Sequence, residues 1–193
     1  MNEFYPLFAQ AAVVAIEAAW LSVAVYDNFR HPTLNQRGFA TVLTMDLVRQ
    51  QDPDAYREVS VRRIDDPDLE DRLFHLLVAA EATVAALLWL GALGLLLASF
   101  GIIDHPPARA FAMIAVVGFT ALWGGMLIGG EWFWYRIGMA PAMQAHFFLI
   151  VWGIATLTFL ATARKRTAWP PTIGRQGTDR ACQLLTGRER RLR

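Results

Sequence analysis

The sequence has few charged residues, a single cysteine and a single lysine. Only 18% of its 193 residues are charged, whereas 55% are hydrophobic. This balance excludes an ordinary soluble domain of the same length. Because Cys182 is the only cysteine, the chain can form no internal disulfide and no thiolate cluster. The net charge of +1 leaves no basic surface outside the C-terminal tail, which argues against a nucleic-acid partner.

The hydrophobic residues gather into four long runs. These runs cover residues 6–26, 73–103, 108–130 and 142–163. Each is long enough to cross a hydrocarbon core of about 30 Å as a helix. We therefore predict an all-α, integral membrane four-helix bundle in the lipid bilayer, with residues 1–166 as the transmembrane domain and 167–193 as a basic, mobile tail. The first run follows no basic segment, so we expect a retained span rather than a cleaved signal peptide.

Residues 27–72 form a hydrophilic connection with seven arginines and ten acidic residues, too long for a simple turn. We expect this extramembrane connection to be structured. Within 38–49, apolar residues at helical spacing predict a short helix that lies along the membrane surface. Asp66, followed by Pro67, is typical of a helix start, and we expect that helix to continue into the second span.

Basic residues are concentrated after the fourth hydrophobic run. From Arg164 onward the sequence has nine basic and two acidic residues, and Arg164, Lys165 and Arg166 follow the run directly. Positive residues next to a span favour the cytoplasmic side. We therefore expect a bacterial inner-membrane protein with both termini in the cytoplasm.

Two acidic residues interrupt the hydrophobic runs. Glu17 lies nine residues before Tyr26, and Glu81 lies eight residues after Leu73. Because the first two spans are antiparallel, these numbers predict that the two carboxyl groups lie at similar depth. The same half of the bundle should contain a group of further polar residues, namely His75, Glu131, Gln144 and His146. We expect this set to form a polar cluster in the membrane.

The polar cluster has two interpretations. It could relay protons or ions, or its acids could be protonated and hydrogen-bond neighbouring helices. No span contains the Glu-x-x-His pair of four-helix metal sites, so we predict no metal site and no cofactor. A haem held by His75 and His146 is a further alternative.

Aromatic and small residues mark two other features. Trp132, Phe133, Trp134 and Tyr135 follow Glu131, and such aromatic residues belong at a membrane–water interface. Small residues recur every fourth position at Ala121, Gly125 and Gly129, and again at Ala11, Ala15 and Ala19. This spacing permits close helix approach, either inside the monomer or in a dimer.

Three features of the sequence form a recognisable set: Gly129-Gly130-Glu131-Trp132-Phe133 with Gln144, Asn35 with Val42-Leu43-x-Met45-Asp46, and Glu81. They resemble a bacterial family of small integral membrane proteins, domain of unknown function 2165. The resemblance covers residues 20–160. Thr41 stands where the family usually has a histidine. The resemblance implies a four-helix membrane architecture and draws attention to Glu131, Trp132 and Gln144, but it implies no activity.

The sequence contains no nucleotide-binding loop, no Ser–His–Asp pattern and no nucleophilic cysteine motif. We therefore expect a non-enzymatic accessory or structural subunit, whose partner is another membrane subunit or a second copy of the chain. The alternatives are a small proton- or ion-coupled carrier that uses the intramembrane glutamates, and a redox subunit that holds a metal or haem.

Overall fold

A computed structural model describes residues 4–162, and all of its regular elements are helical. Four long helices make up the bundle: α1 (Phe4–Arg30), α5 (Pro67–Ser99), α6 (His105–Trp132) and α7 (Ala140–Thr162). All four are long and apolar enough to cross a membrane. The predicted four-helix membrane architecture is therefore confirmed. The basic residues Arg164, Lys165 and Arg166 and the tail after them lie outside the described residues.

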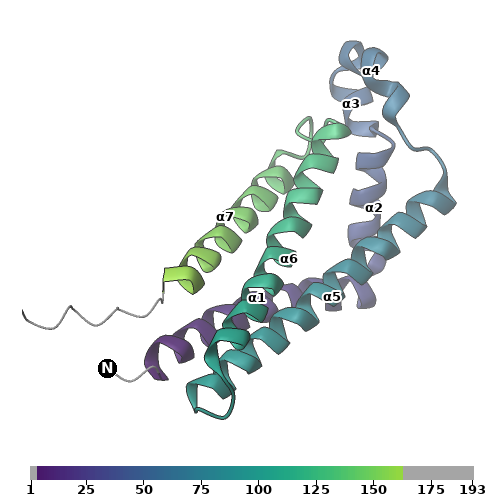
Figure 1. The fold of residues 1–193 in the computed structure, drawn as a ribbon. Helices are drawn as coiled ribbons and strands as arrows, with labels where there is room; N and C mark the ends of the chain where they lie inside the picture. Colours follow the sequence, from purple (N-terminus) through teal and green to yellow (C-terminus); the bar gives the residue numbers. More distant parts are fainter. Residues whose placement is uncertain (1–3, 163–193) are drawn as a thin grey trace, which may run out of the picture. The chain divides into compact units, whose positions relative to one another are not determined.

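The long helices pack mainly in the order of the chain. α1 lies along α5, α5 packs against α6, and α6 packs against α7, whereas α1 meets α7 over a short stretch only (Figure 1). Leucine, alanine and valine fill the shared core, with Phe119 and Trp123 as its large aromatic members. Large apolar side chains such as Ile114, Ile128 and Phe148 point outward. Helices that are apolar on all faces suit a lipid environment.

The connection between α1 and α5 is folded, as expected. It contains α2 (Pro32–Leu43), α3 (Asp46–Gln51), α4 (Pro53–Val59) and a 3₁₀ turn at Ser60–Arg62. We refer to residues 32–62 as the cap, which Figure 1 shows at the α6–α7 end of the bundle. The single helix expected over 38–49 is wrong, because Met45 adopts a left-handed conformation (φ 58°) that separates α2 from α3.

The ends of α5 have clear local causes. At its start, the Asp66 carboxylate accepts hydrogen bonds from the backbone N–H groups of Asp68 and Leu69, and Pro67 occupies the first turn. The predicted helix start at Asp66 and the continuous helix into the second span are both confirmed. At its end, Gly101 (φ 71°) lets the N–H of Ile102 bond the carbonyl of Leu97, a glycine-terminated helix end. The helix therefore stops four residues before the predicted Ile103.

The hydrogen bonds that Asp66 accepts at the start of α5 give a first test. Asp66→Ala removes the acceptor for two backbone N–H groups, so we expect a loss of about 1 kcal/mol in the free energy of unfolding. Asp66→Asn keeps an acceptor in the same place and should unfold like the wild type. Unfolding of the purified protein in mixed micelles, followed by circular dichroism, measures both changes. Equal stability of Asp66→Ala and Asp66→Asn would contradict the proposed role.

Candidate functional site

Glu17 lies inside the bundle at the midpoint of α1, thirteen residues from either end of the helix. Its side chain is fully buried. Its Oε1 accepts a hydrogen bond from Thr156 Oγ1 on α7 (2.6 Å), while its Oε2 is buried without a partner. A carboxyl group in the apolar core of a membrane is costly, about 2.5–3.5 kcal/mol on insertion scales. The hydrogen bond from Thr156 satisfies only one of the two carboxyl oxygens of Glu17.

Glu81 is a buried acid with a different environment. Its Oε2 accepts a hydrogen bond from Asn28 Nδ2 near the end of α1 (2.7 Å). Asn35 on α2 donates in turn to Asn28 Oδ1 (2.6 Å). This chain of three side chains joins α1, α2 and α5. Glu81 therefore acts within the structure as an interhelical hydrogen-bond acceptor.

The prediction that Glu17 and Glu81 lie at similar depth is wrong. Asn28 faces Glu81, and Ser22 accepts a hydrogen bond from Trp89, so α1 and α5 run antiparallel in this register. Glu17 comes before Ser22 in α1 and hence faces a level of α5 beyond Trp89. At 1.5 Å per residue, it is at least about 12 Å from the level of Glu81. The prediction aligned Tyr26 with Leu73. In the structure α1 continues to Arg30, and the first turns of α5, which begins at Pro67, extend beyond the C-terminal end of α1.

The other members of the expected polar cluster also have separate partners. Glu131 pairs with Arg136 (2.6 Å), and His75 lies on the surface near Asp71 (3.4 Å). Gln144 is exposed near the start of α7. Within residues 4–162, no three histidine, cysteine or acidic side chains are close enough to hold a metal ion. The expected single cluster is thus several separate polar contacts.

His146 lies in an aromatic stack. Its ring is stacked between Trp123 and Tyr135, with centroid separations of 5.5 and 5.9 Å. Burial, and secondarily the Glu131 carboxylate, raise the pKa of Tyr135 to about 12. The phenol therefore keeps its proton at neutral pH, and its hydroxyl lies 3.3 Å from His146 Nδ1, where it can donate a hydrogen bond. This stack links the end of α6 to α7.

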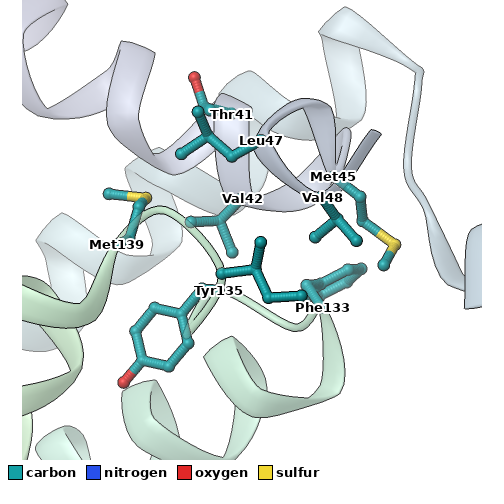
Figure 2. Close-up of a pocket in the computed structure, with 9 residues that line it drawn as sticks. Thr41, Val42, Met45, Leu47, Val48, Phe133, Tyr135 and Met139 are labelled. Carbon is teal, nitrogen blue, oxygen red and sulfur yellow. The ribbon is translucent and has the colours of Figure 1, made fainter. Parts of the chain in front are cut away.

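The cap is joined to the α6–α7 connection by a small apolar core of its own. Met45, Val48 and Val59 are buried there against partly buried residues of the connection, including Phe133 and Ile137. Figure 2 shows Met45, Val48 and Phe133 converging from the two segments. The hollow between them measures about 10 Å³, room for about one water molecule. This junction is filled by side chains and is not a ligand cavity.

Two glycines make this junction possible. A Cβ on Gly130 would lie 2.7 Å from the Tyr135 ring, so the ring can pack there only over a glycine. Gly138 has a φ of 86° and lies against Leu47 of the cap. The aromatic segment also anchors the cap, because the Arg62 guanidinium lies over the Trp132 ring at 4.5 Å. Tyr135 is buried and Phe133 is packed, whereas Trp132 is exposed.

Sequence reasoning missed several residues that complete these contacts. Asn28 and Thr156 are the partners of the two buried acids, and Arg62 holds the cap to Trp132. A buried acid requires a donor on a neighbouring helix, and this signal could have directed attention to Asn28 and Thr156. The sequence offers no comparable signal for Arg62, which is one of seven arginines in the connection.

Residues 7–163 match the family described as predicted small integral membrane protein (DUF2165). The chain belongs to this family. No curated protein and no solved structure matches it.

Several residues of the segments that resemble the DUF2165 family lie at two joints of the fold. Asn35 and Glu81 are the ends of the hydrogen-bonded chain through Asn28. Met45 and Phe133 meet in the small core between the cap and the α6–α7 connection. Asn35, Glu81, Met45 and Phe133 thus take part in contacts that hold the cap in place, whereas Gln144 is exposed.

Gly130 provides a test of the cap junction. Gly130→Ala would force the Tyr135 ring to move, and we expect a loss of about 1–3 kcal/mol in the free energy of unfolding. Gly125→Ala on the same helix is the matched control, because its new Cβ meets nothing within 4 Å. That control should leave stability unchanged or raise it slightly, since alanine favours helices. Denaturant unfolding in micelles compares the two, and equal effects would refute the packing argument.

Proposed function

We propose that this membrane protein is a non-enzymatic accessory subunit that binds a transmembrane helix of a partner membrane protein. The observation that carries the proposal is the outward direction of the small-residue ladder on α6. Ala121 and Gly125 are exposed, and a Cβ added at Gly125 or Gly129 would meet nothing within 4 Å. In lipid, helix association depends on close backbone approach, which small residues permit. The ladder therefore offers a flat face that the chain itself leaves uncovered.

The ladder on α1 serves as an internal comparison. Ala11 is buried, and Ala15 is packed against the same core. The two ladders have the same spacing but different positions: on α1 only Ala19 is exposed, whereas on α6 both Ala121 and Gly125 are exposed. The α1 ladder supports packing within the chain, whereas the α6 ladder is available to a second molecule.

The double variant Gly125→Leu/Gly129→Leu tests this proposal. The bulky side chains point away from the bundle, so the variant should fold with unchanged stability. Its association should weaken at least about tenfold, which corresponds to about 1.4 kcal/mol. Native gel electrophoresis and cross-linking in the producing membrane measure the complex, and Ala155→Leu on the exposed face of α7 is the control.

Three outcomes are distinguishable. A complex of two identical chains that the double variant dissociates identifies a second copy as the partner, and this would replace the accessory role with self-association. A hetero-complex that the double variant dissociates supports the accessory role. A stable, free monomer isolated under native conditions would count against the proposal as a whole.

We also propose that the chain resides in a bacterial inner membrane with both termini in the cytoplasm. The basic residues from Arg164 to Arg166, which directly follow the fourth span in the sequence, support this orientation. With four spans, the cap then lies on the opposite side. A fluorescent protein fused after Arg193 should be bright, and alkaline phosphatase inserted at Asp65 should be active. The reverse pattern would establish the opposite orientation.

A further inference from the structure

The meeting line of α1, α6 and α7 carries a series of buried polar groups, which we call the polar seam. Gln10 on α1 is fully buried; its amide nitrogen lies 3.4 Å from the Phe159 carbonyl on α7, to which it donates. Arg109 on α6 donates to Gln10 Oε1 (3.3 Å). Glu17 follows Gln10 by seven residues, about 10 Å along α1. The α1–α5 contact, in contrast, is mainly leucine and alanine at this level.

The polar seam also contains the unsatisfied groups. Within residues 4–162, the buried side-chain atoms without a hydrogen-bond partner are Glu17 Oε2, Arg109 Nη2 and Trp123 Nε1. All three belong to α1 and α6. Buried polar atoms are normally satisfied by protein or by ordered water, and each exception needs an explanation. Two of these atoms are the acceptor Glu17 Oε2 and the donor Arg109 Nη2. The first belongs to Glu17 and the second to the residue that donates to Gln10.

The two ends of the polar seam differ. Toward the cap, Trp20, which is 40% exposed, packs edge-on against both Trp123 (5.7 Å) and Trp152 (6.2 Å), and these rings lie beyond Glu17 along the bundle. At the α5–α6 turn, a hollow of about 500 Å³ is lined by residues that include Leu7 and His105. Leu7 is one turn before Gln10, and His105 is one turn before Arg109. The polar groups therefore begin one turn inside this hollow.

We propose that Glu17 is a proton-binding carboxyl group that exchanges its proton with water entering from the α5–α6 turn, along Gln10 and Arg109. A proton on Oε2 removes the charge that is costly at this depth. The aromatic side chains between Glu17 and the cap close the opposite route. Glu81 has no such role, because Asn28 donates to its Oε2, neither of its oxygens is buried without a partner, and it lies at a different level.

The charged and titratable groups around Glu17 are few. α6 contributes Arg109, two turns away along the seam, and α7 contributes the neutral Thr156. His146 on α7 is ten residues from Thr156, about 15 Å away and beyond the tryptophans. From α5, the core residues at this level are apolar, including Leu88, Ala92 and Leu95. Glu17 thus titrates without a nearby acid.

Infrared spectroscopy of the full chain in lipid vesicles tests the proposal. Glu17→Gln should remove a protonated-carboxyl band that Glu81→Gln leaves in place. On transfer to D₂O, this band should shift rapidly in the wild type. Gln10→Leu should slow the shift at least about tenfold, since it removes polar groups from the entry route. Trp123→Leu, on the closed side, is the matched control and should not slow the shift.

A lipid-soluble carbodiimide, which reacts with protonated carboxyl groups, provides a readout that needs no substitution. Mass spectrometry should locate the adduct at Glu17, with labelling that declines about tenfold per pH unit above its midpoint. The proposal is overturned if Glu17 stays unlabelled at every pH, or if Gln10→Leu exchanges as fast as the wild type. It is also overturned if sodium in place of choline removes the band, because the ligand would then be a metal cation.

Discussion

The hydrogen bond from Asn28 to Glu81 sets the register of α1 against α5, and the positions of the other polar groups depend on it. In a lipid environment, apolar side chains do little to fix how far one helix slides along another. A buried carboxylate accepts from a donor at one level only, and loss of this bond would leave Glu81 unsatisfied. Because Asn35 also bonds Asn28, the same contact fixes where α2 leaves the bundle.

The long helices and the start of α5 could be predicted from the sequence, because their signals are local. Hydrophobic length defines a span, and Asp66 before Pro67 defines a helix start. The register of the helices could not be predicted, because periodicity gives the face of a helix but not its axial position. The break at Met45 was also missed, since a left-handed methionine is held by its buried contacts with the α6–α7 connection and not by its own preference.

The glycines of α6 have different roles, although they lie close together in the sequence. Gly130 lies under the Tyr135 ring and belongs to the cap junction, while Gly125 and Gly129 have open space before them. A regular spacing of small residues therefore does not show what covers them. Only the neighbours in space separate a residue that admits an aromatic ring from one that remains free for another helix.

The two buried acids illustrate the same separation of roles. Glu17 and Glu81 are each the single acid of a hydrophobic run, 6–26 and 73–103, and sequence alone gives them equal standing. Glu81 lies near the end of α1 and is joined to two other side chains, so its removal would affect the fold. Glu17 lies at the midpoint of α1 with one oxygen unsatisfied, which a contact of purely structural value would not require. The two acids therefore differ in their environment: Glu17 Oε2 is buried without a partner, whereas Glu81 accepts from Asn28 and neither of its oxygens is buried without one.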